Sequence, residues 1–308
     1  MKAKHLISIR DLSTADVAEI FRHATEMKRF PDRFRDTLAG KTLAMIFHRP
    51  SIRARVSFEV GVYQLGGLGL YLSGDDLGLG RDETIPNVGR VLSRYAGAIM
   101  AGGYDHAEMV ELSKSASVPV INGLSDLLDP CQALADYFTL VEKKGDLKGK
   151  KIAYVGDGNS ICHSLLYGAN KVGIHIAVAT PLGYEPKSII MKSVLREASQ
   201  VGVTVSSSSD AVEAVVGADA VYTDVWVPPG QEADAERRRE AFRPYQVNAT
   251  LMAKAKPDAV FMHRLPARPE EEVSTEVLDG QQSIVLDQVE SRLHVQKALV
   301  HLLMATAT

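Results

Sequence analysis

A hydroxyl and two arginines gather within five consecutive residues, Ser51-Ile52-Arg53-Ala54-Arg55. They follow a short apolar run, at the point where a helix is expected to begin. The start of a helix carries unpaired amide N–H groups and a partial positive charge. Together with a hydroxyl and two guanidinium groups, these donors make a cradle for phosphate. The segment also fits an ordinary helix cap followed by surface arginines, so the choice depends on the rest of the chain.

A second polar group surrounds the expected start of another helix. Asp129 and Gln132 flank Pro130, which suits the first helical position. Asp129 either caps this helix or faces a ligand, where a carboxylate repels a developing oxyanion unless it is protonated. Gly102, at the end of a nearby expected strand, can add a backbone donor but no charge.

The second half of the chain carries its polar residues after expected strands. Gly156-Asp157-Gly158-Asn159-Ser160 is such a turn, and Ile161 stands where a dinucleotide-binding motif requires glycine. Asp224 follows another strand, and Pro228 and Pro229 stiffen the loop after it. Arg264, between His263 and Leu265, places a fixed cation that disfavours a ligand ammonium. It could instead supply the charge that Gly102 lacks, bind an acidic group, or be a plain surface arginine.

Apolar runs and turn residues predict the elements that position these groups. Strands and helices alternate, which predicts α/β architecture with parallel sheets. Expected strands cover residues 43–47, 68–72, 98–101, 118–122, 151–155, 174–180, 203–206, 220–223 and 259–262. The Gly- and Asp-rich stretch 74–82 is expected to be a loop. A charged stretch with Gly145 and Gly149 predicts a domain boundary near 146, giving domains at 1–146 and 147–290.

Composition narrows the class of protein. With 308 residues, 45% hydrophobic and 24% charged, the chain is long enough for two soluble domains. The net charge of -3 argues against nucleic acid as a main partner, and no apolar run approaches the roughly 20 residues of a membrane helix. Two cysteines and the absence of a secretory signal favour the cytoplasm. Since His and Cys show no metal-ligand spacing, no metal or other cofactor is expected.

These motifs, in this order, resemble those of the aspartate/ornithine transcarbamoylase family, and most of all its ornithine carbamoyltransferase branch. Residues 51–55 resemble the family's Ser-Thr-Arg-Thr-Arg, and 129–132 its His-Pro-x-Gln. Residues 156–160 resemble Gly-Asp-Gly-Asn-Asn, 263–266 His-Cys-Leu-Pro, and 290–292 Glu-Asn-Arg. The similarity covers nearly the whole chain.

The resemblance implies two doubly wound parallel-sheet domains, a carbamoyl-phosphate domain at 1–146 and an amino-acid domain at 147–290, with a C-terminal helix at 291–306 that returns to the first. It implies a homotrimer, or a multiple of trimers. The implied phosphate and carbamoyl ligands are Ser51, Ile52, Arg53, Ala54, Arg55, Gly102, Asp129, Gln132 and Arg292. The implied amino-acid ligands are Asn159, Ser160, Asp224, Pro228, Pro229, His263, Arg264 and Leu265.

The implied reaction is attack by a deprotonated side-chain amine on the carbamoyl carbon, which releases phosphate. Positioning and charge stabilisation would drive it, without a covalent intermediate. Arg53, Gln132, Arg264 and Arg292 are the expected catalytic residues.

The chain departs from the family pattern at Ile52, Ala54, Gly102, Asp129, Ser160, Pro228, Pro229 and Arg264. We therefore expect a carbamoyltransferase with an altered acceptor or weakened ornithine activity. Two alternatives are different chemistry on an amino-acid-like ligand and a non-catalytic binding homologue.

Overall fold

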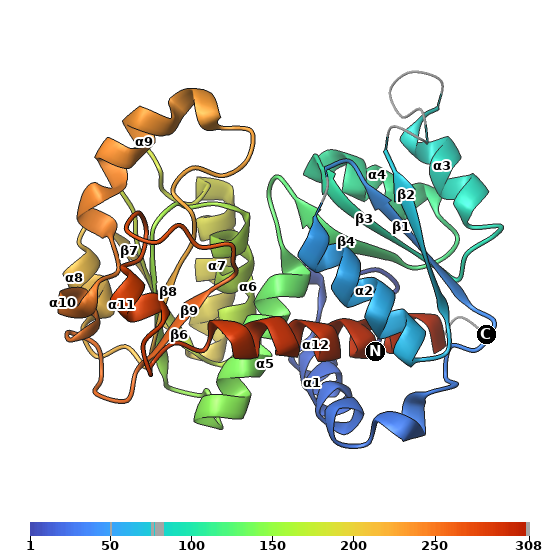
Figure 1. The fold of residues 1–308 in the computed structure, drawn as a ribbon, viewed down its shortest axis with the longest axis horizontal. Helices are drawn as coiled ribbons and strands as arrows, with labels where there is room; N and C mark the ends of the chain where they lie inside the picture. The colour runs from blue at the N-terminus through green and yellow to red at the C-terminus, as the bar shows by residue number, and fades with distance from the viewer. Residues whose placement is uncertain (50, 75–76, 78–82, 306–308) are drawn as a thin grey trace. The chain divides into compact units, whose positions relative to one another are not determined.

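The computed structural model describes residues 1–49, 51–74, 77 and 83–305, so most of the expected loop at 74–82 lies outside the described residues. The chain forms two compact units, Met1–Phe138 with Glu290–Thr308, and Thr139–Val289 (Figure 1). The division falls inside one helix, α5, which precedes the boundary expected near 146. Within the described part of the chain, no helix is both long and apolar enough to cross a membrane.

The first unit contains a four-stranded parallel sheet in the order β2-β1-β3-β4. Its strands are β1 Thr42–Phe47, β2 Leu68–Ser73, β3 Ala98–Tyr104 and β4 Val120–Ser125. Its helices are α1 Thr14–Arg29, α2 Ile52–Gln64, α3 Ile85–Leu92 and α4 His106–Ser115, with short 3-10 turns at Ile9–Asp11 and Pro31–Phe34. Apolar side chains of α3 and α4 pack against one face of this sheet.

Two long helices cross the division between the units. They are α5 Pro130–Lys144 and α12 Val285–Ala305, and the greater part of α12 belongs to the first unit. The C-terminal helix therefore returns to the N-terminal unit, although it begins six residues earlier than expected at 291.

The second unit contains a five-stranded parallel sheet in the order β7-β6-β5-β8-β9. Its strands are β5 Lys151–Val155, β6 His175–Ala179, β7 Val205–Ser208, β8 Ala220–Thr223 and β9 Val260–His263. Its helices are α6 Ser160–Val172, α7 Ser188–Val201, α8 Ala211–Val215, α9 Ala235–Phe242, α10 Ala249–Met252 and α11 Thr275–Leu278, with 3-10 turns at Glu232–Asp234 and Arg243–Tyr245.

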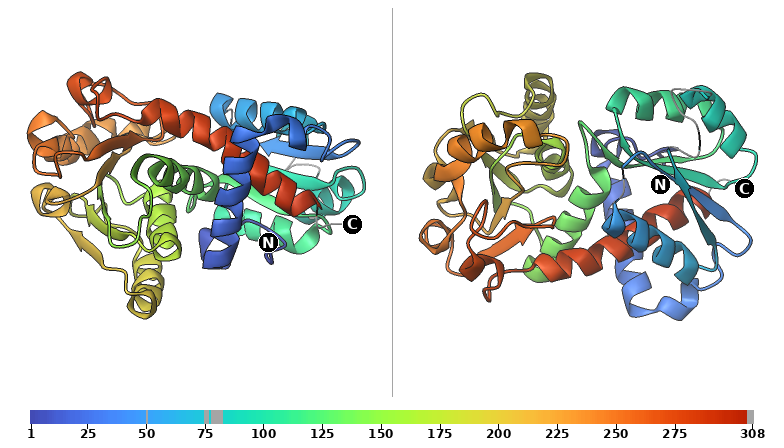
Figure 2. Two further views of the ribbon diagram at one scale, coloured as in Figure 1. Left: turned by 90° about the horizontal axis from the view of Figure 1, so that it is seen from below. Right: turned by 45° about the horizontal axis from the view of Figure 1, so that its top comes forward.

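Helices cover both faces of the second sheet. Side chains of α8, α10 and α11 pack on one face, and α6 and α7 lie on the other (Figures 1 and 2). The strand order reverses between β5 and β8, because β6 and β7 extend the sheet to one side and β8 and β9 to the other. In open α/β sheets, ligands bind beyond the carboxyl ends of the strands at such a reversal.

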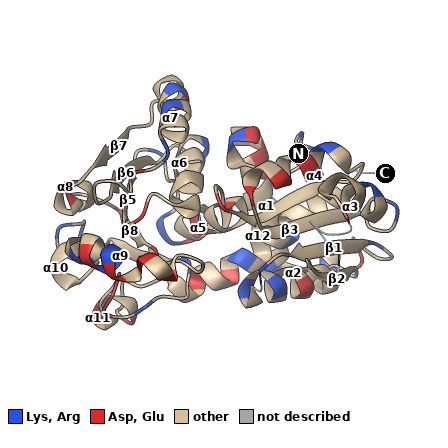
Figure 3. Ribbon diagram, turned by 90° about the horizontal axis from the view of Figure 1, so that it is seen from above, with Lys and Arg blue, Asp and Glu red and all other residues tan. Residues whose placement is uncertain are grey.

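The fold prediction is confirmed in its essentials, since all nine expected strands are present and both sheets are parallel. The differences are local. The short helices α9, α10 and α11 were not expected. Their weak apolar periodicity explains the omission: α9, for example, carries acidic and basic residues along most of its length (Figure 3).

Candidate functional site

The phosphate segment lies where β1 gives way to α2. Ser51 occupies the N-cap position, in an extended conformation with φ -140°, but its side chain makes no capping hydrogen bond. Ile52 is exposed, whereas Ala54 is buried. The Ser51 hydroxyl therefore does not cap α2, which was the alternative role that the sequence left open.

Arg55 extends along α2 towards the edge strand β2. Its guanidinium carbon lies 4.0 Å from the ring centroid of Tyr71, and its Nε lies 3.3 Å from an oxygen of Glu59. Arg53 is exposed one position after Ile52 on the first turn. An exposed pair spaced four residues apart is worth only about 0.3–0.5 kcal/mol, so it is a weak restraint on Arg55.

The two glycines at the end of β3 differ in what they can accommodate. Gly102 pairs with Phe47 of β1, its carbonyl accepts from the His48 amide at 3.0 Å, and a Cβ there would lie 3.7 Å from the Phe47 ring. Gly103 has φ +87°, and its Cβ would come within 3.0 Å of the Arg49 amide nitrogen. A side chain therefore fits at 102, while 103 requires glycine.

Gln132 and Arg292 meet in the first unit. Arg292 Nη1 donates to Gln132 Oε1 at 2.7 Å, and Gln132 Nε2 donates to Asp136 Oδ1 at 2.8 Å. The Nε of Arg292 is buried and has no hydrogen-bond partner within the described part of the chain. The structure thus brings together two of the residues expected to hold the carbamoyl group.

Asp129 is buried beside this pair and caps α5, because its Oδ1 accepts from the Gln132 amide at 3.3 Å. Burial raises the pKa of the neighbouring Cys131 thiol to about 12, with a further increase from the Asp129 charge that Arg292 opposes. Such a thiol stays protonated at neutral pH and is not a nucleophile.

In the second unit, Asn159 joins the end of β5 to the end of β8. Its Oδ1 accepts from the amides of Ile161 and Cys162 at 3.1 and 3.2 Å, which caps α6. Its Nδ2 donates to Asp224 Oδ2 at 2.8 Å. Ser160, the first residue of α6, is buried. One amide thus fixes both the helix start and the Asp224 carboxylate at the point where the strand order reverses.

Arg264 binds the other oxygen of that carboxylate. Its Nε donates to Asp224 Oδ1 at 3.0 Å, and the side chains of Asp224 and Arg264 are 1% and 17% exposed. The two residues follow the adjacent parallel strands β8 and β9, which explains how positions 40 residues apart meet. The carboxylate is therefore neutralised by the protein itself.

His263 has a structural environment. The Leu265 amide donates to His263 Nδ1 at 2.8 Å, so Nδ1 is an acceptor and the proton resides on Nε2. Nε2 then donates to Glu272 Oε1 at 3.1 Å, and both side chains are fully buried. Leu265 packs on the core cluster of the sheet. Arg264, between His263 and Leu265, contacts Asp224 instead.

The loop after Asp224 turns tightly. Pro228 is half-buried and Pro229 exposed, and the Pro228 carbonyl accepts from the Gln231 amide at 3.1 Å. Trp226 is buried and stacks on Phe242 with the ring centroids 6.2 Å apart. It anchors the loop to α9.

A second buried ion pair was missed by the sequence reasoning. Arg238 Nη2 donates to Asp157 Oδ2, and Arg238 Nε donates to the Trp226 carbonyl. Burial raises the pKa of Asp157, while Arg238 opposes that rise. Arg238 lies within three consecutive arginines that suggest a surface helix, but Phe242, four residues on and fully buried, was the available signal that this face points inward.

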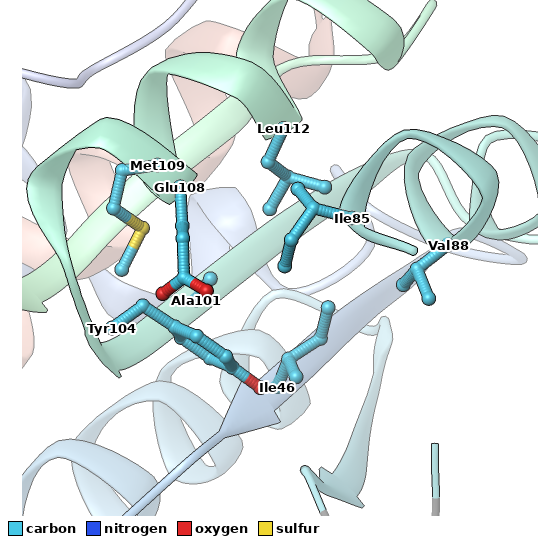
Figure 4. A pocket seen from close by; sticks show the side chains of 8 residues that line it. All are labelled: Ile46, Ile85, Val88, Ala101, Tyr104, Glu108, Met109 and Leu112. Carbon is cyan, nitrogen blue, oxygen red and sulfur yellow. The ribbon is translucent and has the colours of Figure 1, made fainter. Parts of the chain in front are cut away.

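A small apolar cavity in the first unit is separate from all these groups. It lies between the sheet, through Ile46 and Ala101, and the helices α3 and α4, through Val88, Met109 and Leu112 (Figure 4). It contains none of the expected ligand residues, so it belongs to the core.

Comparison with known proteins agrees with this architecture. Residues 4–142 match the family model of the aspartate/ornithine carbamoyltransferase carbamoyl-P binding domain, and residues 148–303 match that of the Asp/Orn binding domain. The chain is 50% identical over 309 residues to ornithine carbamoyltransferase of Thermococcus kodakarensis, covering 99% of this chain and 97% of the relative. It is likewise 50% identical over 309 residues to that of Pyrococcus abyssi, covering 99% and 96%.

A solved structure shows the same similarity in three dimensions. Ornithine carbamoyltransferase from Pyrococcus furiosus superimposes with a TM-score of 0.94 at 51% identity, covering 97% of this chain and 96% of that one. The two sheets, the returning C-terminal helix and the matches along nearly the full length lead to one conclusion: the chain belongs to the aspartate/ornithine carbamoyltransferase family.

Proposed function

We propose that this protein transfers the carbamoyl group of carbamoyl phosphate to the amine of an amino acid, and that ornithine is a poor acceptor. The deprotonated amine attacks the carbamoyl carbon and forms a C–N bond. The C–O bond to phosphate breaks, phosphate leaves with the electron pair, and the amine loses a proton to solvent. The ornithine carbamoyltransferases among its relatives support the reaction class.

The contact between Gln132 and Arg292 carries the proposal. A carbamoyl group has a carbonyl acceptor and an amide donor, and this pair presents both a guanidinium and a carboxamide. The buried Nε of Arg292 adds a donor that no described residue uses. Fixed donors aimed at a developing oxyanion lower the barrier because they need no reorganisation during the reaction. Ser51, Arg53 and Arg55 are proposed to hold the phosphate.

Two residues of the proposed carbamoyl-phosphate site, Gly102 and Asp129, lead us to expect a slow enzyme. The family pattern that the chain resembles has an arginine at the position of Gly102. One charge-assisted hydrogen bond is worth about 1.5–3 kcal/mol. Its loss in the transition state corresponds to a rate lower by roughly ten- to a hundredfold. Asp129 adds a buried carboxylate next to the carbamoyl-binding pair, which further disfavours an oxyanion.

We also propose a homotrimer, or a multiple of it, in the cytoplasm, where the two buried free thiols Cys131 and Cys162 would stay reduced. Helix α2 exposes an apolar stripe at Ile52, Val56, Val60 and Tyr63, and the adjacent edge strand β2 exposes Leu68 and Leu70. An apolar surface of this kind favours association. Size-exclusion chromatography with light scattering should give three times the mass of one chain or a multiple, and a monomer would contradict the assembly.

The direct test of the reaction follows phosphate release and ureido-product formation from carbamoyl phosphate with a panel of amino acids. We expect acceptor-dependent product and stabilisation of the protein by carbamoyl phosphate alone. The Gln132→Ala variant should lose both. If wild type shows neither product with any acceptor nor stabilisation by carbamoyl phosphate, the proposal is wrong.

One observation favours a second candidate, a non-catalytic binding protein. The Asp224 carboxylate is already neutralised by Arg264, so this part of the site is complete without a substrate ammonium. Such a protein would be stabilised by an amino-acid ligand without releasing phosphate from carbamoyl phosphate. Ligand-induced stabilisation and phosphate release, measured on the same protein, therefore distinguish the enzyme from the binding protein.

A further inference from the structure

Arg238 of α9 joins two segments that follow neighbouring strands of the second sheet. Its Nη2 donates to Asp157 Oδ2, in the turn after β5, and its Nε donates to the Trp226 carbonyl, in the segment after β8. Strands β5 and β8 are paired and parallel, so both segments leave the sheet at the same edge. One guanidinium therefore bridges two segments at the edge where open α/β sheets bind ligands.

The same two segments have a second connection close by. Asn159 Nδ2 donates to Asp224 Oδ2 at 2.8 Å. Each of these residues is two positions away from the residue of its own segment that Arg238 binds. Because the two connections are so near in the chain, a shift of the Arg238 bridge moves the contact between Asn159 and Asp224 as well. The bridge thus controls the spacing of two residues that are proposed to hold the amino acid.

Arg238 is itself firmly placed by its surroundings. Its side chain is 7% exposed, and its guanidinium carbon lies 4.8 Å from the ring centroid of Tyr184 and 5.2 Å from that of Phe242. The Phe242 ring also stacks on Trp226. A guanidinium enclosed by aromatic rings is poorly hydrated, so its hydrogen bonds are stronger than those of a surface arginine. Its position is accordingly better defined.

The two hydrogen bonds of this guanidinium do different things. Burial raises the pKa of Asp157, and the charge of Arg238 opposes that rise, so the Nη2 contact balances a buried carboxylate. The Nε contact goes to an uncharged backbone carbonyl and adds nothing to that balance. It fixes the main chain two residues after Asp224. Charge neutralisation alone would require only the first of these contacts.

We propose that Arg238 is a positioning residue of the acceptor end of the site: it sets the spacing of Asn159 and Asp224 before any ligand binds. Its effect on the segment after β8 follows from the contacts above, whereas its effect on the reaction rests on the proposed function. The carbamoyl-binding pair Gln132 and Arg292 belongs to the first unit. Loss of the bridge should therefore weaken use of the acceptor and leave carbamoyl-phosphate binding unchanged.

The variants separate position from stability. The double variant Asp157→Asn/Arg238→Met removes both charges, so it should recover most of the stability that Arg238→Met loses in urea unfolding, yet it has no bridge. Arg238→Lys keeps the charge but loses the planar fork that spans two partners. Arg237→Met, at the 71% exposed neighbouring arginine, is the matched control.

Trp226 reports the position of its segment without any ligand, because it is the only tryptophan in the chain. Its side chain is 4% exposed, so acrylamide should quench its fluorescence weakly in wild type. In the folded double variant and in Arg238→Lys, the quenching constant should rise about twofold or more, because the segment opens locally. Arg237→Met should keep the wild-type constant.

Steady-state kinetics test the same proposal on the reaction. L-ornithine, L-lysine and L-aspartate are the probe acceptors, and the one that wild type carbamoylates fastest is used for every variant. In the double variant, KM for that acceptor should rise about ten- to a hundredfold, the loss expected when binding groups are misplaced. KM for carbamoyl phosphate should stay at its wild-type value, and Arg238→Lys should lie between wild type and the double variant.

A purely structural arginine gives a different result, because restoring stability would then restore function. Wild-type quenching or a wild-type acceptor KM in the folded double variant would overturn the proposal, and so would an equal rise in both Michaelis constants. If the double variant does not fold, the same criteria apply to Arg238→Lys, which keeps the charge that Asp157 needs. If wild type carbamoylates none of the probes, that result contradicts the proposed function, and quenching of Trp226 alone decides whether Arg238 positions its segment.

Discussion

Gln132 and Arg292 are 160 positions apart in the chain, yet Arg292 Nη1 donates to Gln132 Oε1 at 2.7 Å. Gln132 is on the first turn of α5, and Arg292 lies in the part of α12 that belongs to the N-terminal unit. The return of the C-terminal helix thus has a chemical consequence, because it delivers a guanidinium to the start of α5.

Replacing either member of this pair should weaken carbamoyl-phosphate binding. Gln132→Ala removes the acceptor that orients Arg292, and Arg292→Lys removes the planar fork. We expect the dissociation constant for carbamoyl phosphate to rise by about ten- to a hundredfold in each, the equivalent of about 1.5–3 kcal/mol. Calorimetric titration measures it. Arg22→Lys, at an exposed arginine on α1, is the control, and an equal loss in that variant would show the effect to be nonspecific.

The neighbouring glycines of β3 should respond in opposite ways to substitution. Gly102→Arg should fold, since among the described residues a Cβ there meets only the Phe47 ring, at 3.7 Å. The new cation should tighten carbamoyl-phosphate binding about tenfold or more. Gly103→Thr should lower the melting temperature, because φ is +87° and the Cβ would lie 3.0 Å from the Arg49 amide nitrogen. Melting curves with and without carbamoyl phosphate test both. A Gly102→Arg variant that folds without tighter binding would contradict the assignment of this position.

The ion pair between Arg238 and Asp157 should be a large stability determinant of the second unit. Arg238→Met leaves a buried carboxylate without its partner, which typically costs about 3–5 kcal/mol. The double variant Asp157→Asn/Arg238→Met removes both charges and should recover much of that loss. Urea unfolding of the two variants, compared with Arg237→Met, measures the coupling. If Arg238→Met is as stable as Arg237→Met, the ion pair between Arg238 and Asp157 contributes little to stability.

His294 should make stability depend on pH in the acidic range. Burial lowers the pKa of His294 to about 4, with contributions from Lys297 and Lys28 that Glu290 opposes. In the unfolded chain the pKa is near 6.5, so between about pH 6.5 and pH 4 the unfolded state binds the extra proton and stability falls as the pH falls. His294→Gln should flatten this part of the stability curve while matching wild type in slope above pH 7. Parallel curves from pH 7 to pH 4 would contradict the prediction.

The sequence predicted the framework well because each strand is a compact apolar run bounded by turn residues. Local signals are equally direct: α1 begins with a capping box, in which Ser13 Oγ accepts from the Asp16 amide and Asp16 Oδ2 from the Ser13 amide. The sequence could place Asp224 and Arg264 after their strands but could not show that they touch, because that depends on the strand order β5-β8-β9. Arg238 was missed because its charged helix offers one local signal of an inward face, Phe242 four residues on, and Tyr184, the other ring that Arg238 contacts, is distant in the sequence.

Binding of ornithine to the wild-type protein tests the central claim most directly, namely that the protein itself already neutralises Asp224 through Arg264. Ornithine is titrated by calorimetry into the wild-type protein saturated with carbamoyl phosphate. If Arg264 neutralises Asp224, we expect no saturable heat at millimolar ornithine and at most a trace of citrulline in the calorimeter cell afterwards. Saturation at micromolar ornithine, with citrulline formed, would show that Arg264 yields the carboxylate to the substrate and would contradict the claim.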